Sequence, residues 1–150
     1  MGASGWDYVV PYQPDLQAAL DDLRRQVFAG GDYISPVTWG LTPPESVEAL
    51  AQREYYREFM GDNGTHSVID VLEVVPYDDG EQGFATVCAF TDDEYTDCFG
   101  TTRPTHADWD RFRINPVAQE YLASRWTGRA MILWSGDTPS EIAFWGYSGD

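Results

Sequence analysis

The pattern of apolar and polar positions along the chain predicts strands near both ends and helices between them. Aromatic and β-branched residues over 6–12 predict a first strand. We expect it to end near Pro11 and to lie at a sheet edge, because proline cannot donate a ladder hydrogen bond. Apolar residues at helical spacing over 16–27 predict a first helix, which Gly30 and Gly31 end.

The next part of the chain predicts a loop and a second helix. Residues 31–40 indicate a mixed loop with a short strand. Residues 42–45 form a capping box with proline at the first helical position, and the helix is expected to continue to about Met60. Its buried face is expected to consist of Val47, Leu50, Ala51, Tyr55 and Phe59.

The middle of the chain predicts a second strand region and a short helix. Residues 66–75 are strand-like, 76–83 form a turn-rich loop, and 84–90 predict a strand. A Thr-x-x-Glu capping box at 91–94 predicts a short helix that Gly100 closes.

The last third of the chain predicts helices followed by a hairpin. Two helical segments are expected over 107–112 and 116–126, with a break before Pro116. Apolar strands over 129–134 and 141–147 flank a turn-forming segment and predict a C-terminal β-hairpin. We therefore expect an α+β fold, a mostly antiparallel sheet with helices packed on one face.

Length and composition fit a single domain over residues 1–150. A chain of 150 residues with 43% hydrophobic residues can bury one core. Its apolar runs are strand-sized, far below the roughly 20 residues needed to cross a bilayer. Because the first residues lack the basic and apolar regions of a secretory signal, we expect a cytoplasmic protein.

The charge balance limits the possible partners. The chain has 25 acidic and 9 basic residues, a net charge of −16, and every basic residue is arginine. Nucleic acid and anionic membranes are disfavoured as direct ligands, because both are bound through basic surfaces. The charge favours a basic protein partner. Alternatively, the acidity only keeps the protein soluble, as a monomer or small homo-oligomer.

Acidic residues concentrate in the middle of the chain. No basic residue occurs between Arg57 and Arg103, and the acidic residues there alternate with apolar segments that need burial. This pattern predicts a folded acidic face rather than a disordered tail. The binding residues expected on it are Asp70, Glu73, Asp78, Asp79, Glu81, Asp92, Asp93, Glu94 and Asp97.

The sequence predicts no cofactor, no metal site and no catalytic residue. Nine residues separate Cys88 from Cys98, and the two histidines lack the spacing of zinc ligands. Free, buried or half-buried thiols are expected in a cytosolic protein. The alternative interpretation is a small-molecule enzyme or sensor in which His66, Asp70 and Cys88 lie around an aromatic-lined pocket.

Several segments carry a resemblance to other proteins. They are residues 5–12, 31–33, 64–70 and 144–150. In these segments the chain resembles a group of small acidic proteins of actinobacterial type, which implies a bacterial cytoplasmic protein with one compact domain and carries no activity with it. In size and acidity the chain is also similar to immunity proteins that neutralise basic toxin domains, by analogy of type. Together these observations favour a non-enzymatic inhibitor of a basic toxin or nuclease over the small-molecule alternative.

Overall fold

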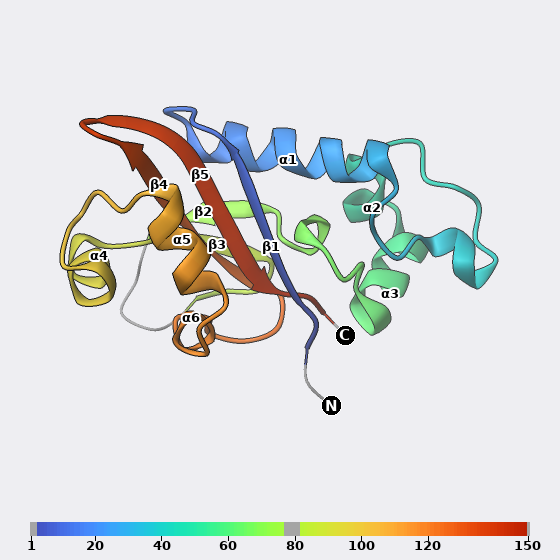
Figure 1. The fold of residues 1–150 in the computed structure, drawn as a ribbon. Coiled ribbons are helices and arrows are strands. Elements are labelled where there is room, and N and C mark those ends of the chain that lie inside the picture. Colours follow the sequence, from blue (N-terminus) through green and yellow to red (C-terminus); the bar gives the residue numbers. More distant parts are fainter. Residues whose placement is uncertain (1–2, 77–81, 150) are drawn as a thin grey trace.

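A five-stranded mixed sheet forms the centre of the fold (Figure 1). The computed structural model describes residues 3–76 and 82–149. The strands are β1 (Gly5–Pro11), β2 (Glu73–Val75), β3 (Thr86–Ala89), β4 (Thr127–Ser135) and β5 (Thr138–Tyr147). Their order is β1-β5-β4-β3-β2, with antiparallel pairing of β1 with β5 and of β5 with β4, and parallel pairing of β4 with β3 and of β3 with β2.

Six α-helices surround the sheet in the described part of the chain. They are α1 (Leu16–Gly30), α2 (Val47–Gln52), α3 (Glu54–Asn63), α4 (Asp92–Phe99), α5 (His106–Arg113) and α6 (Val117–Glu120). Short 3₁₀ helices occur at Pro36–Trp39 and Val68–Asp70. None of these helices is long and apolar enough to cross a membrane.

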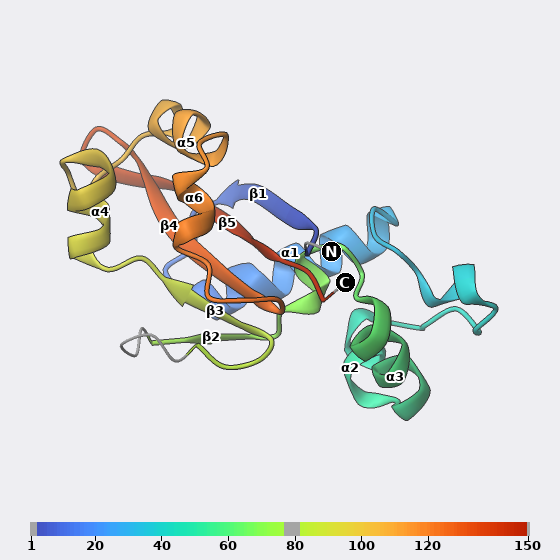
Figure 2. The same cartoon turned by 90° about the horizontal axis from the view of Figure 1, so that it is seen from below.

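The sheet is covered on both faces, whereas the sequence predicted helices on one face. Ile142 and Phe144 of β5 belong to the hydrophobic cluster of α1, α2 and α3, and Ala143 and Trp145 belong to the cluster of α4, α5 and α6. Figures 1 and 2 show the two helical layers on opposite sides of the sheet. Four consecutive buried residues are typical of a central strand with both faces covered, because neighbouring side chains point in opposite directions.

The α+β class and the C-terminal hairpin are confirmed, and so are two of the capped helices. The capping box expected at 42–45 does not form, because α2 begins at Val47 with Ser46 as its N-cap. The hairpin joins β4 to β5 through Gly136 and Asp137. The side chain of Asp15 caps α1, which ends at Gly31 in the left-handed conformation (φ 72°). The predicted capping box of α4 is present, and β1 is an edge strand. The sheet is mixed: its two long pairings, β1 with β5 and β5 with β4, are antiparallel as predicted, and the two short pairings, β4 with β3 and β3 with β2, are parallel.

The predicted second helix is divided in two at Arg53. The backbone of Arg53 is extended (φ −83°, ψ 131°), so α2 ends there and α3 begins with a new register. The inward aromatic residue is consequently Tyr56, with 0% of its surface exposed, and Tyr55 is 38% exposed instead of buried.

Three other segments differ from their predicted form. The expected strand within 31–40 is a 3₁₀ helix, and only residues 73–75 of the strand-like segment 66–75 form a strand. Of the helix expected over 116–126, four residues are helical. The turn-rich loop of 76–83 lies mainly outside the described residues.

Candidate functional site

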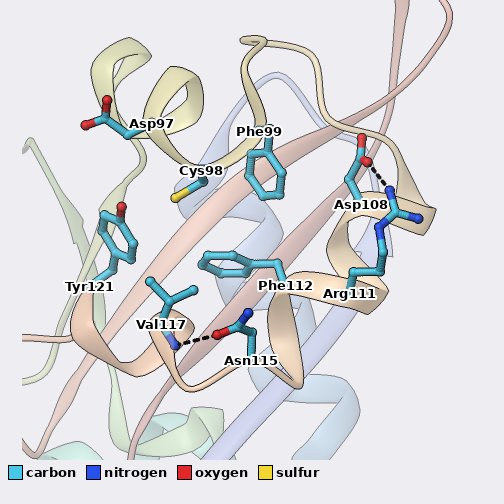
Figure 3. Close-up of a pocket in the computed structure, with 9 residues that line it drawn as sticks. All are labelled: Asp97, Cys98, Phe99, Asp108, Arg111, Phe112, Asn115, Val117 and Tyr121. Carbon is cyan, nitrogen blue, oxygen red and sulfur yellow. Dashed lines mark hydrogen bonds and ion pairs between the residues drawn. The ribbon is translucent and has the colours of Figure 1, made fainter.

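An open groove lies among α4, α5 and α6 on one face of the sheet (Figure 3). Its volume is about 540 Å³. Phe99, Phe112, Val117 and Tyr121 supply an apolar and aromatic lining, and Asp97 lies beside them on α4. The remaining lining residues are Cys98, Asp108, Arg111 and Asn115.

A buried ion pair fixes α4 beside the sheet. Arg129 of β4 donates to both carboxylate oxygens of Glu94, at 2.8 Å to Oε2, and the two side chains are 4% and 15% exposed. The same guanidinium donates to the backbone carbonyls of Cys88 and Ala89 on β3, and of Tyr121 after α6. Arg129 therefore connects the elements that form one wall of the groove.

The thiol in the groove is not activated for catalysis. Burial raises the pKa of Cys98, and its side chain forms a hydrogen bond with the Tyr121 hydroxyl. That hydrogen bond, together with burial, raises the pKa of Tyr121 to about 12. Both groups are therefore protonated near neutral pH, and a protonated thiol is a weak nucleophile.

One side of the groove is electrically neutralised. Arg111 forms an ion pair with Asp108, whose pKa is lowered by the backbone N–H of Thr105 and by the Arg111 charge. Asn115 accepts a hydrogen bond from the backbone N–H of Val117 at 3.0 Å. Asp97, in contrast, forms no ion pair with any residue that the structure describes.

The predicted acidic residues that the structure describes differ in their exposure. Asp92, Asp93 and Asp97 are exposed on α4, and Glu73 is exposed on the edge strand β2. Glu94 is paired with Arg129 and is not available on the surface. Residues Asp78, Asp79 and Glu81 lie outside the described part of the chain.

Asp70 is buried rather than exposed, which corrects its predicted place on the acidic face. Its carboxylate accepts hydrogen bonds from the Thr65 backbone N–H at 2.8 Å, the Thr65 hydroxyl at 2.6 Å and the Gly149 N–H at 3.1 Å. These contacts connect the loop after α3 to the C-terminal segment. Burial raises the pKa of Asp70 despite the three donors.

The structure brings together two of the three residues in the alternative catalytic set. His66 lies close enough to Asp70 for their charges to interact, and its Nδ1 lies 3.3 Å from the Ser4 hydroxyl. Cys88 follows Val87, whose side chain packs on the α1 side of the sheet, so the Cys88 side chain points to the other face. A thiol nucleophile is therefore not placed beside His66 and Asp70.

No metal site is formed within residues 3–76 and 82–149, and both cysteines are free thiols. The groove and its Arg129 support are features that the sequence reasoning missed. Arg129 at the start of an apolar strand was the available signal, because a charged residue in a buried strand requires a partner.

Comparisons with protein-family models, curated proteins and solved structures find no match to this chain. The resemblance to small actinobacterial proteins therefore stays a prediction. The functional argument rests on the residues of this chain alone.

Proposed function

We propose that this chain is a non-enzymatic acidic binding protein that docks on a basic partner and blocks it, in the manner of an immunity protein or antitoxin acting on a toxin or nuclease. The contact surface is the acidic face of α4, defined as Asp92, Asp93 and Asp97, together with the adjoining groove. Nuclease and nucleic-acid sites are basic because they bind phosphates, so an acidic surface is complementary to them.

The observation that carries this proposal is that unpaired carboxylates lie on α4, a helix that also lines the apolar groove. Most exposed arginines pair with nearby acidic residues, as Arg25 does with Glu48, Arg53 with Glu45 and Arg103 with Asp137. Within the described residues no arginine pairs with the three exposed α4 carboxylates. Their charge is therefore available to a partner.

The groove adds an apolar contact to this charge. Interfaces gain most of their affinity from a few well-packed anchors surrounded by polar residues. Phe99, Val117 and Tyr121 line a space that could receive a side chain of the partner, and Asp97 at the edge would pair with a lysine or arginine. Charge would then govern the rate of encounter, and the groove would favour retention of the bound partner.

The test compares two variants of equal net charge. The first is D92K/D93K/D97K on α4, and the second is E54K/E58K/D62K on α3, where the three carboxylates are also exposed and unpaired in the described structure. Each protein serves as bait in a bacterial lysate at low and high salt. Any captured protein is then purified, and its association rate and nuclease or toxin activity are measured with each bait.

We expect wild type and the α3 variant to capture and inhibit the same basic protein, with an association rate that salt lowers. The α4 variant should neither capture nor inhibit that protein. Equal loss in both variants would mean that total charge, not the α4 face, determines binding. Retention by the α4 variant, or a partner that is bound without inhibition, would refute the proposal.

The alternative of a small-molecule enzyme is less well supported, because the Cys88 side chain points away from His66 and Asp70 and cannot serve as their nucleophile. Asp70 nevertheless borders an apolar pocket on the α3 side of the molecule. This observation supports ligand binding there more than catalysis.

A further inference from the structure

A second pocket lies where α2 and α3 meet the segments that precede β3 and β4. Its volume is about 200 Å³, and its wall is largely apolar. Met60, Leu72, Phe84 and Trp126 line it. Phe84 is 70% exposed although it is a large apolar side chain, so the chain leaves an aromatic ring at the surface beside the pocket.

Arg57 of α3 lines the same pocket. Its guanidinium forms no ion pair or hydrogen bond within the described structure, in contrast to the guanidinium groups of exposed arginines that pair with carboxylates. In a protein with a net charge of −16, a cation that remains unpaired beside an apolar cavity is unusual. An unpaired guanidinium is a binding group for carboxylates.

The aromatic wall is fixed by a strained backbone. Trp126 and Ala85 both have positive φ angles, 63° and 59°, which bulky or ordinary residues rarely adopt. A Cβ on Gly149 would overlap the Trp126 indole, so the C-terminal backbone packs directly against this ring. The ring centroids of Phe84 and Trp126 lie 4.9 Å apart. Backbone strain of this kind is concentrated at ligand sites.

We propose that this pocket binds a small carboxylic acid with one apolar ring. The ring packs against Phe84 and Trp126, and the carboxylate pairs with Arg57. The size is suitable, because an apolar cavity of about 150 Å³ accommodates benzene. Asp70 also lines the pocket, but its carboxylate already accepts the Thr65 and Gly149 hydrogen bonds. Arg57 is therefore the lining residue whose side chain remains available to the ligand carboxylate.

The test is calorimetric titration of the intact protein with three ligands of one shape. Phenylacetate carries the carboxylate, phenylacetamide is its neutral counterpart, and 2-phenylethylamine carries a positive charge. We expect phenylacetate to bind with a dissociation constant on the order of 1 mM, typical of about ten non-hydrogen atoms in a small site. The amide should bind about tenfold more weakly, because it lacks the charge-assisted hydrogen bond.

Three variants locate the binding. Arg57→Gln should weaken phenylacetate about tenfold and leave phenylacetamide unchanged, and Phe84→Ala should weaken both ligands. Arg103→Gln is the matched control on an exposed arginine outside the pocket and should change neither. All three positions are exposed, so the fold should be retained, which circular dichroism checks.

The proposal is overturned if phenylacetate gives no binding at 10 mM, if the amide binds as tightly as the acid, or if Arg57→Gln has no effect. Tighter binding of 2-phenylethylamine would also overturn it and would assign recognition to Asp70 instead. None of these outcomes depends on the protein partner of α4, so the two proposals can fail separately.

Discussion

At the scale of single residues, Asp70 fastens the C-terminal segment to the loop after α3. Burial raises its pKa above the ordinary 3.8, so protonation of this carboxyl group stabilises the folded state relative to the unfolded state. The stabilisation from this group is fully present below that ordinary value and is lost as the pH rises through the folded pKa. The difference in unfolding free energy between wild type and Asp70→Asn should therefore fall as the pH rises from 4 to 7, in urea titrations.

Asp70→Ala is the companion variant, because it removes the oxygens that accept from Thr65 and Gly149. We expect Asp70→Ala to lower the free energy of unfolding by about 2–4 kcal/mol, more than Asp70→Asn does, since buried donors are left unsatisfied. A pH-independent difference between wild type and Asp70→Asn would contradict the raised pKa.

The pair of Glu94 and Arg129 should show the opposite pH dependence. Burial alone would raise the pKa of Glu94, but the hydrogen bonds from Arg129 and Thr91 outweigh it and lower the pKa below the ordinary 4.5. Stability from Glu94 is thus present above that ordinary value and is lost as the pH falls through the folded pKa. The destabilisation caused by Glu94→Gln should shrink when urea unfolding is measured at progressively lower pH.

Arg129→Met should be more damaging than Glu94→Gln at neutral pH. It leaves Glu94 and the Cys88, Ala89 and Tyr121 carbonyls without their donor, and breaking a buried pair costs about 3–5 kcal/mol. The double variant E94Q/R129M should lose less unfolding free energy than the sum of the losses in the two single variants, because no unpaired charge remains. Additive losses would mean that the two side chains do not interact.

At the scale of elements, the Trp6 indole of β1 crosses the backbone of β5 at a glycine. Gly128 and Gly146 face each other across β4 and β5, and a Cβ on Gly146 would overlap the indole and the Thr127 carbonyl oxygen. Gly146→Ala should therefore lower the free energy of unfolding by about 1–3 kcal/mol, as overpacking does. Gly5→Ala is the matched control on β1, where the nearest atom to a new Cβ is 3.9 Å away. Equal losses in the two variants would refute this close packing.

Elements were predictable where a local signal defines their ends. Asp15 and Gly31 around α1, and the Thr91 capping box of α4, act through contacts a few residues apart, so the sequence contains the whole cause. The break at Arg53 is different, because neither proline nor glycine occurs there and helical spacing continues across it. Tertiary packing of Tyr56, whose hydroxyl donates to the Thr42 carbonyl at 2.6 Å, favours the shifted register.

At the scale of the whole molecule, the layer arrangement and the site were only partly predictable. The unbroken apolar run of β5 contained the evidence for burial on both faces, but strand order depends on pairings such as Thr86 with Thr127 that are distant in the sequence. The acidic composition indicated a charged surface, yet it could not separate exposed Asp93 from buried Asp70. That distinction arises from the partners that the fold places beside each carboxylate.

The same excess of acidic residues should oppose folding by self-repulsion. With a net charge of −16 and few exposed arginines left unpaired, screening by salt should stabilise the folded state. We expect the melting temperature to rise by several degrees between about 20 and 200 mM NaCl, which corresponds to roughly 1 kcal/mol for a domain of this size. Differential scanning calorimetry measures this shift directly.

A variant with less negative charge distinguishes the screening of charge repulsion from other effects of salt on stability. Glu58→Lys combined with Asp62→Lys replaces two exposed carboxylates of α3 with cations, away from the α4 face. This double variant should melt higher than wild type at low salt and should gain less from added NaCl, because less repulsion remains to be screened. If both proteins gained equally, salt would be acting on the apolar surface rather than on charge. A smaller gain in the variant would mean that the acidic surface of the protein is maintained at a cost in stability.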